Sequence, residues 1–169
     1  LGTCLQPGSN RVIIQTHSGG PGAAAADACS RNGLKLPQFS EETLTRLAPL
    51  VPHTGSVGNP VDLTFSKNPM DYFADIPDTL LAEPAAGGLL MYFLTPGQLI
   101  RRTMESMEIP PDKIPKLTEK LFNDQAGSLA SLVKKHQKTV LGFTFQSHDN
   151  LFIQKLFEHE LPVFPSPER

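Results

Sequence analysis

The chain has 169 residues with a formal net charge of −2, and 19 % of its residues are charged. A near-neutral chain without a run of Lys and Arg lacks the electrostatic footprint of a nucleic-acid-binding protein. No apolar run approaches the roughly 20 residues that span a bilayer, and no basic segment followed by an apolar stretch indicates a secretory signal. Two cysteines, Cys4 and Cys29, are too few for a disulfide framework or a zinc site. We therefore expect one cytoplasmic domain that binds neither nucleic acid nor membrane.

The first predicted elements are a strand, a glycine-rich turn and a helix. Residues 11–16 are a short β-branched run, and His17-Ser18-Gly19-Gly20-Pro21-Gly22 follows at once. The alanine-rich segment 23–32 then ends at Gly33, a residue type that often terminates helices. A brief second strand is expected at residues 34–36. Cys29 is expected to be a small core residue of the helix.

The next segment predicts a helix, a strand and a second helix. Ser40 is a suitable N-cap, and Leu44 and Leu47 would form the buried face of its helix. A short strand follows at residues 61–64. A helix is expected from Asn68-Pro69, with a bend or break at Pro77.

The second half of the chain repeats the alternation of strands and helices. Predicted strands lie at residues 88–94, 139–145 and 161–164, and the first is apolar enough to be buried on both faces. Three helices are predicted in this half: one that starts at Thr95-Pro96, one over about 115–136 and one over 150–160. The inner face of the first of these helices would consist of Leu99, Ile100, Thr103, Met104 and Met107.

Strands that alternate with helices predict an α/β fold, in which a doubly wound parallel sheet is buried between two helical layers. Because the sequence begins with Leu1 instead of Met, we expect a fragment of a larger multidomain protein. Residues 1–9 would be a linker or an end segment, and 10–169 the domain.

The glycine-rich turn is the strongest local signal for a binding site. Ligands of such sheets bind at the carboxyl ends of strands, and glycines let an anion approach the backbone N–H groups at the start of a helix. A proline in the first helical turn removes no donor that the helix needs. The alternative is a tight turn that binds nothing.

Three named motifs fit this turn poorly. No Lys follows it, which excludes a Walker A loop. Residues 20–25 match the dinucleotide pattern G-x-G-x-x-A, but Glu41 stands at the start of a helix and not at the tip of the second strand. Residues 17–22 are similar to the oxyanion loop of α/β-hydrolases, yet the chain contains no G-x-S-x-G elbow.

Several blocks, taken in order, resemble the NDP-forming acyl-CoA synthetases, the acetyl-CoA synthetase relatives of succinyl-CoA synthetase. The blocks are residues 10–22 with 26–28 and 33–34, then 36–43, then Ser56-Val57-Gly58-Asn59-Pro60-Val61-Asp62-Leu63-Thr64, and finally 161–169. The resemblance implies the flavodoxin-like, three-layer αβα domain of succinyl-CoA synthetase. It further implies a phosphate held at the start of the helix near Pro21 and carried on a histidine of a neighbouring domain.

Carried over to this sequence, the resemblance implies a phosphate site lined by Ser18, Gly19, Gly20, Pro21, Gly22 and Ala23, with Asn59 and Asp62 shaping the adjacent loop. It implies partners: a sister domain that bears the phosphohistidine, an ATP-grasp domain and a CoA-binding domain. A homodimer is possible. The implied reaction converts acyl-CoA, ADP and phosphate into acid, CoA and ATP. The fragment itself would hold no cofactor tightly and would catalyse nothing alone, so no catalytic or metal-binding residue is assigned.

Some features depart from the family or leave its function open. The family has Asn where this chain has His17, which we expect to be a hydrogen-bonded loop residue. The segment 109–137 matches poorly, and His136, His148 and His159 are expected at the surface without metal-ligand spacing. The same resemblance fits a regulatory lobe of a protein acetyltransferase, and a non-catalytic interaction domain is a third possibility. The acyl substrate and the choice of ADP or GDP stay open.

Overall fold

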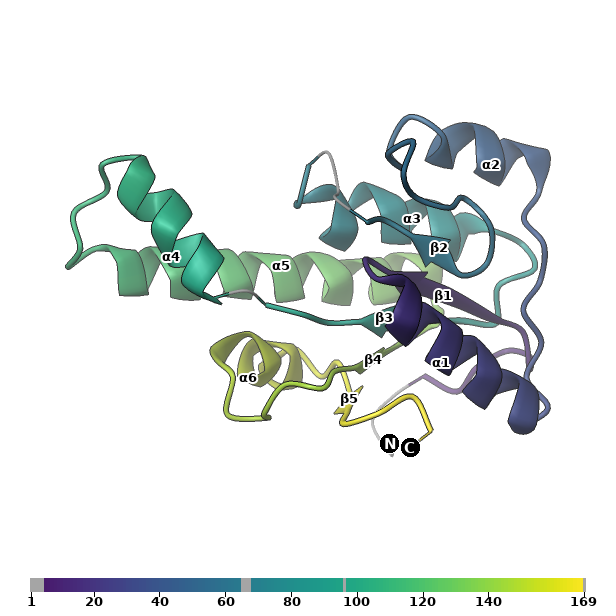
Figure 1. The fold of residues 1–169 in the computed structure, drawn as a ribbon. Coiled ribbons are helices and arrows are strands. Elements are labelled where there is room, and N and C mark those ends of the chain that lie inside the picture. Colours follow the sequence, from purple (N-terminus) through teal and green to yellow (C-terminus); the bar gives the residue numbers. More distant parts are fainter. Residues whose placement is uncertain (1–4, 65–67, 96, 169) are drawn as a thin grey trace.

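The apolar β-branched runs of the sequence form one parallel sheet in the computed structural model, which describes residues 5–64, 68–95 and 97–168. Within these residues the sheet has five strands in the order β2-β1-β3-β4-β5 (Figure 1). The strands are β1 (Val12–Thr16), β2 (Val61–Asp62), β3 (Gly88–Tyr92), β4 (Thr139–Phe143) and β5 (Val163–Phe164). All neighbouring strands are parallel. The predicted doubly wound α/β fold is confirmed.

The helices are α1 (Gly19–Arg31), α2 (Glu41–Leu47), α3 (Asp75–Ala82), α4 (Gly97–Ser106), α5 (Ile114–His136) and α6 (Leu151–Glu158), with a 3₁₀ turn η1 (Asp71–Phe73). The chain leaves β1 toward β2 through α1 and α2, and returns through η1 and α3 to β3 on the other side of β1. The order of strands therefore reverses between β1 and β3, and ligands of open α/β sheets bind outside the carboxyl ends of strands at such a point.

Each face of the sheet packs into its own apolar cluster. On one face Ile13, Leu89 and Met91 pack with buried side chains of α2, α3, α5 and α6. On the other face Ile14, Tyr92 and Phe143 pack with Ala25 and Cys29 of α1. Cys29 is buried, as the sequence predicted. The three layers are therefore present. Within the described residues, however, α1 is the only helix that covers the face of Ile14, Tyr92 and Phe143.

Because one helix is narrower than the sheet, a groove of about 350 Å³ remains beside α1. Its apolar walls include Val12, Leu90, Leu141 and Phe164. Leu90 and Leu141, the central residues of β3 and β4, are only half-buried. The expectation that residues 88–94 are buried on both faces thus holds for most of the segment, but not for Leu90 at the centre of β3 or for Leu94, which is 44 % exposed.

Local chemistry explains where α2 begins. The hydroxyl oxygen of Ser40 accepts a hydrogen bond from the Thr43 N–H, as the N-cap prediction requires. The carboxylate of Glu83, at the end of α3, accepts hydrogen bonds from both the N–H and the hydroxyl of Ser40. The predicted buried face of α2 is partly wrong, since Leu47 is buried but Leu44 is 37 % exposed and Thr43 takes its place.

Two other predictions in the first half need correction. Residues 34–36 form no strand, because the segment meets β1 only at a single bridge between Arg11 and Lys35. The helix expected from Asn68 is interrupted at Ala74 and not at Pro77. Pro77 is the third residue of α3, within the first turn, where a backbone N–H has no helical acceptor and its loss costs nothing.

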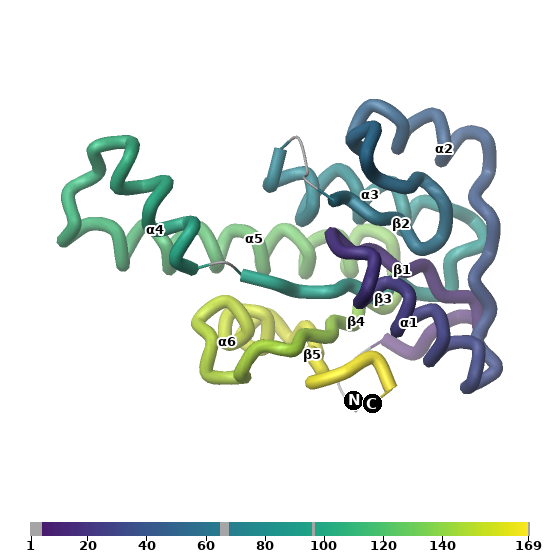
Figure 2. The backbone as a smooth tube through the Cα atoms, in the orientation of Figure 1, coloured from purple at the N-terminus to yellow at the C-terminus, as the bar shows by residue number. Residues whose placement is uncertain are grey.

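The hairpin of α4 and the first half of α5 extends beyond the carboxyl ends of the strands (Figures 1 and 2). None of the described α4 residues is fully buried, but Ile100 packs against the main apolar cluster, so the predicted inner face of α4 is only partly right. Leu99 and Met107 are 61 % and 67 % exposed. Ile100 and Met104, on one edge of the apolar stripe, are half-buried. Pro96, the predicted start of this helix, lies outside the described residues. No helix among the described residues is long and apolar enough to span a membrane.

Candidate functional site

The start of α1 lies directly against the carboxyl end of β1. A Cβ atom on Gly22 would approach Cγ2 of Thr16 to 2.8 Å, closer than side chains pack, so any other residue here would force α1 or Thr16 to shift. Gly20 differs, because a Cβ built there meets no atom within 4 Å. The glycines of the loop therefore divide into one that lets the helix pack against the strand and one that faces open space.

The hydrogen bonds of this turn show which backbone donors are available. The Ser18 N–H donates to the Thr16 hydroxyl at 3.0 Å, the Gly22 N–H donates to the Ser18 carbonyl at 3.2 Å, and Pro21 has no N–H. Within the part of the chain that the structure describes, the N–H groups of Gly19 and Gly20 have no acceptor. Ser18, the N-cap, makes no side-chain capping bond, and the first turn contains no acidic residue. Two backbone donors at the positive end of a 13-residue helix thus face outward.

Asp62 lies beside these donors at the end of β2. Its Cα is in register with that of Thr16, and its Oδ2 atom is 3.5 Å from the position that a Cβ on Gly19 would take. Its Oδ1 atom accepts hydrogen bonds from the N–H and the hydroxyl of Thr64, at 3.1 and 2.9 Å. The loop after β2 therefore fixes a carboxylate at the first turn of α1.

Asn59 has a different role from Asp62. Its side-chain oxygen accepts the Ile14 N–H at 3.0 Å, and its amide nitrogen donates to the carbonyls of Val12 and Pro37. These bonds continue the hydrogen bonding of β1 along the edge that the two-residue strand β2 leaves open. Because the amide is used by the backbone, the structure brings Asp62 but not the Asn59 amide to the donors of α1.

An aromatic group borders the site on the side of β3. The ring of His17 lies 5.2 Å from that of Tyr72 and 5.3 Å from that of Tyr92. The Tyr72 hydroxyl donates to the Tyr92 carbonyl, and the Gln15 amide donates to the Tyr72 carbonyl at 2.8 Å. Tyr72 thereby ties η1 to both β1 and β3 across the point where the strand order reverses.

Burial controls the protonation of His17 and Tyr72. Burial lowers the pKa of His17, although the hydrogen bond to its own backbone and the charge of Asp62 both raise it. Burial, with smaller contributions from Tyr92 and Asp62, raises the pKa of Tyr72 well above its usual value. His17 and Tyr72, the two groups on which the charge of Asp62 acts, are therefore both neutral at neutral pH. His17 packs between rings, and the structure gives its side chain no hydrogen bond to another described residue.

Sequence reasoning did not identify Thr16, Thr64, Tyr72 or Tyr92 as parts of this site. Tyr72 and Tyr92 are the only tyrosines of the chain. Tyr92 ends an apolar strand, where a hydroxyl needs a polar neighbour, and this position could have indicated that Tyr92 belongs to a polar site. Thr16 and Thr64 gave none, because threonine is common in strands and turns.

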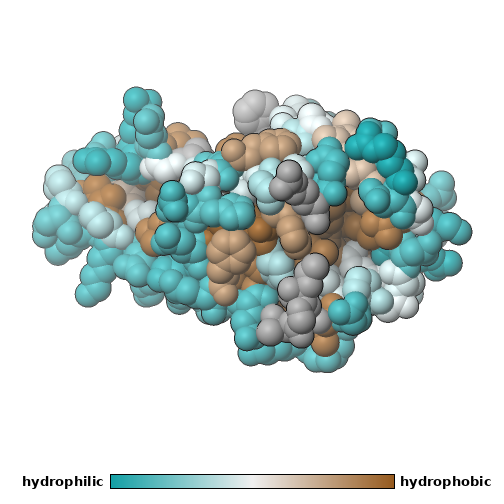
Figure 3. Space-filling model, turned by 90° about the horizontal axis from the view of Figure 1, so that it is seen from below, coloured by the Kyte–Doolittle hydropathy of each residue, from teal (hydrophilic) through white to brown (hydrophobic). Residues whose placement is uncertain are grey.

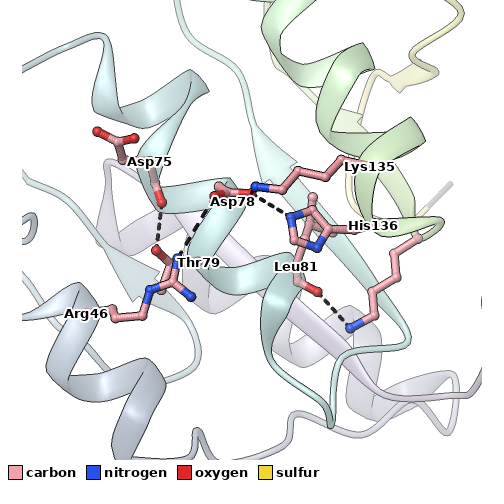
Figure 4. Close-up of polar contacts among 8 residues, drawn as sticks. Arg46, Asp75, Asp78, Thr79, Leu81, Lys135 and His136 are labelled. Carbon is pink, nitrogen blue, oxygen red and sulfur yellow. Dashed lines mark hydrogen bonds and ion pairs between the residues drawn. The ribbon is translucent and has the colours of Figure 1, made fainter.

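A second polar cluster lies away from this site, where α2, α3 and α5 meet (Figure 4). Asp78 Oδ1 is 2.6 Å from His136 Nε2 and 2.7 Å from Lys135 Nζ, while Asp78 Oδ2 is 4.0 Å from an Arg46 guanidinium nitrogen. The side chain of His136 is only 14 % exposed, so its predicted surface position is wrong. His148 is exposed, and His159 is half-buried and lies 3.0 Å from the Asn123 side-chain oxygen.

Neither cluster has the composition of a metal site. Among residues 5–64, 68–95 and 97–168, no group of three or more His, Cys, Asp and Glu side chains is placed to hold a metal ion. What the start of α1 offers is two backbone donors and one carboxylate, which is the chemistry of an anion site with an acceptor at its edge.

Comparison with known proteins gives this geometry a family context. Residues 12–98 match the model of the Ligase-CoA domain. The chain is 37 % identical over 90 residues to the alpha subunit of acetate–CoA ligase [ADP-forming] II of Pyrococcus furiosus, covering 53 % of this chain and 20 % of that subunit. It is 26 % identical over 169 residues to the alpha subunit of acetate–CoA ligase [ADP-forming] I of the same organism, covering all of this chain and 32 % of that one.

Solved structures share the fold. An acetyl-coenzyme A synthetase of Candidatus Korarchaeum cryptofilum, whose structure contains phosphate and ADP, aligns with a TM-score of 0.69 at 19 % identity, over 96 % of this chain and 31 % of that one. A protein of Pyrococcus horikoshii aligns with a TM-score of 0.69 at 23 % identity, over 96 % of this chain and 33 % of that one. The chain spans about a third or less of the length of these relatives. Since the family model matches residues 12–98, more than half of the 169 residues, the chain belongs to the Ligase-CoA domain family.

Proposed function

We propose that this chain is the phosphate-holding domain of an ADP-forming acyl-CoA synthetase, and that the start of α1 binds the phosphoryl group that the reaction transfers. The observation that carries the proposal is the pair of outward-facing donors, the N–H groups of Gly19 and Gly20, at the point where the strand order reverses. The family membership and the relatives named as ADP-forming ligases support it.

The arrangement suits transfer of a phosphoryl group between domains. Donors at a helix start bind an anion without bringing a positive side chain that would hold it permanently. Gly20 leaves space for an approaching group, and the α4–α5 hairpin extends from the same edge of the sheet. In this account, residues 10–169 form one domain of a larger protein. A sister domain carries the phosphohistidine, and other domains bind CoA and ADP.

Amide chemical shifts measured by ¹H–¹⁵N NMR test the proposal, with inorganic phosphate added to the chain. We expect the Gly19 and Gly20 signals to shift in a saturable way. In Gly20→Asp a carboxylate occupies the open space and takes up the positive end of the helix, so the phosphate response should be lost. Gly20→Asn has nearly the same shape without the charge and should keep the response.

If inorganic phosphate leaves the signals of Gly19 and Gly20 unchanged in the unsubstituted chain, the proposal is wrong. A response that survives Gly20→Asp unchanged also contradicts it, because the anion would then lie elsewhere.

The same account predicts that the chain alone forms no ATP from acyl-CoA, ADP and phosphate. The start of α1 offers two backbone donors and one carboxylate, and phosphoryl transfer depends on positioning several partners together. A luciferase assay for ATP with acetyl-CoA, ADP and phosphate checks this, and ATP formed by the purified chain would refute it.

A further inference from the structure

The groove beside α1 exposes apolar surface of a parallel sheet. Four helices contribute to the cluster on one face of the sheet, whereas α1 alone contributes to the other within the described residues. Leu90 and Leu141, the central residues of β3 and β4, line the groove of about 350 Å³ and are only half-buried. Helices normally cover both faces of an all-parallel sheet, so the groove is suited to one more helix beside α1.

The C-terminal turn of the chain lies at this groove. After β5, an edge strand of the described sheet, Ser166, Pro167 and Glu168 line the groove opposite residues of α1 (Figure 1). A carboxylate oxygen of Glu168 is 3.7 Å from a guanidinium nitrogen of Arg31, in the last turn of α1. The chain therefore leaves β5 on the face of the sheet that α1 covers.

Ser166-Pro167-Glu168 has the composition of a helix start. Serine is a favoured N-cap, proline is favoured at the first helical position, and an acidic residue in the first turn complements the positive end of a helix. Hydrogen bonds from the Ser166 side chain and from its own backbone N–H lower the pKa of Glu168. Sequence and contacts together indicate a helix that begins at Pro167.

The connections of the sheet place such a helix on the same face as α1. The connection that leaves β1 on the side of β2 contains α1, while the connections that move the opposite way, from β3 through β4 to β5, contain α5 and α6 on the other face. Because crossovers between parallel strands are right-handed, the face depends on the direction of movement across the sheet. A chain that turns back from β5 toward β1 moves as the first connection does, so its helix lies beside α1.

We propose that the groove is the docking site of the helix that begins at Pro167 and continues into the longer protein, and that this helix covers Leu90 and Leu141. The inference rests on one part of the proposed function, that residues 10–169 are one domain of a larger protein, and not on phosphate binding. The lengths of the relatives support it, since one alignment spans all of this chain but only 32 % of the relative.

The test compares this chain with one extended by about 20 residues of the full-length protein, which allows for a usual helix length of about 12 residues. The readout is the relaxation of leucine methyl signals by a soluble gadolinium chelate, which reports how far each side chain contacts water. In the extended chain, Leu90 and Leu141 should lose most of this relaxation and approach Leu89, which is 2 % exposed. Leu44, which is 37 % exposed on α2, should relax equally in both chains.

A charge in the groove provides the matching variant. In the extended chain, Leu141→Lys should expel the helix and restore the relaxation of Leu90, because burial of an unpaired ammonium group is costly. Without the extension, the half-buried position lets the lysine head reach water, so this variant should stay folded, as its amide spectrum would show. Leu44→Lys adds the same charge on α2 and should leave Leu90 protected.

Equal relaxation of Leu90 and Leu141 in the two chains overturns the proposal, and so does protection of Leu90 that survives Leu141→Lys. Protection that rises with the concentration of the 169-residue chain also overturns it, because a second copy would then occupy the groove. None of these results concerns phosphate, whose effect on the Gly19 and Gly20 amide signals tests the proposed function separately.

Discussion

At the scale of single residues, the glycine-rich turn is not uniform. Gly22 is required because its Cα faces Thr16, with 2.8 Å to Cγ2 from a built Cβ, whereas a Cβ on Gly20 meets open space. A sequence motif treats these glycines alike, and the structure assigns packing to one and access to the other.

Gly22→Ala should destabilise the fold by about 1–3 kcal/mol, because α1 must move away from β1 to relieve the contact. Gly20→Ala should change stability little or increase it slightly, since alanine favours a helix over glycine. Urea unfolding followed by circular dichroism measures both. Equal stability of the two variants would contradict the packing role of Gly22.

For single residues, the sequence predicted where the glycine-rich turn lies, but not which of its backbone N–H groups are free to donate. The pattern Ser18-Gly19-Gly20 predicted an open helix start, which the structure has. It did not predict that Thr16 takes the Ser18 N–H or that the Asn59 amide serves β1. Both depend on a strand neighbour distant in sequence, and a local pattern contains no such information.

At the scale of elements, the Asp78 cluster joins three helices. Lys135 and His136 belong to the last turn of α5, Asp78 to α3 and Arg46 to α2. Burial by itself raises the pKa of Asp78, but hydrogen bonds from Lys135 and His136 outweigh it and lower the pKa below its usual value.

A carboxylate whose folded-state pKa is lowered stabilises the fold above its unfolded-state pKa of about 3.9, and the contribution is lost as the pH falls through the folded-state value. Asp78→Asn should therefore cost about 1 kcal/mol at neutral pH. The difference from the unsubstituted chain should shrink when the pH is lowered below about 4. Urea unfolding across this pH range measures it.

Asp112→Asn, at an exposed position between α4 and α5, is the matched control and should show neither the cost nor its pH dependence. A penalty for Asp78→Asn that stays constant down to pH values where carboxylates are protonated would show that packing, and not the charge, holds the three helices.

The sequence predicted elements best where periodicity was long or apolar runs were clear. Strands β1, β3 and β4 lie within their expected ranges, each shortened at one end. The failures came from tertiary context: residues 34–36 meet β1 at only one bridging position, and only one edge of the apolar stripe of α4, at Ile100, packs against the core. An amphipathic pattern indicates a helix but not what covers its apolar side.

At the scale of the whole molecule, helices cover the two faces of the sheet unequally. Four helices contribute to the cluster on one face, while within the described residues α1 alone contributes to the other. In the view from below, apolar side chains gather in the middle of the surface, between more polar ends (Figure 3). Parallel sheets are normally covered on both faces, so the two faces should respond differently to truncation.

Leu89 and Leu141 allow this to be measured, since Leu89 is 2 % exposed on the fully covered face and Leu141 is half-buried beside the groove. Leu89→Ala should cost about 2–5 kcal/mol. Leu141→Ala should cost about 1 kcal/mol, because part of its surface is already in water. Thermal and urea unfolding give both values, and equal costs would mean that the groove is closed in solution.

The doubly wound parallel class was predictable at this scale because a β-α-β alternation permits few arrangements and the family resemblance implied a flavodoxin-like one. The groove was not predictable, since the apolar strands β3 and β4 have the composition of strands covered on both faces. Whether a face of the sheet is covered depends on how many helices pack against it, and the composition of the strands does not contain this information.

The central claim, that the start of α1 holds a phosphoryl group, is tested most directly by a crystal structure of this chain grown with inorganic phosphate. The account predicts a phosphate with oxygens about 2.7–3.2 Å from the Gly19 and Gly20 nitrogens and one oxygen facing Asp62. A phosphate bound only at Arg46 and Lys135, or a first turn of α1 that binds none, would contradict it.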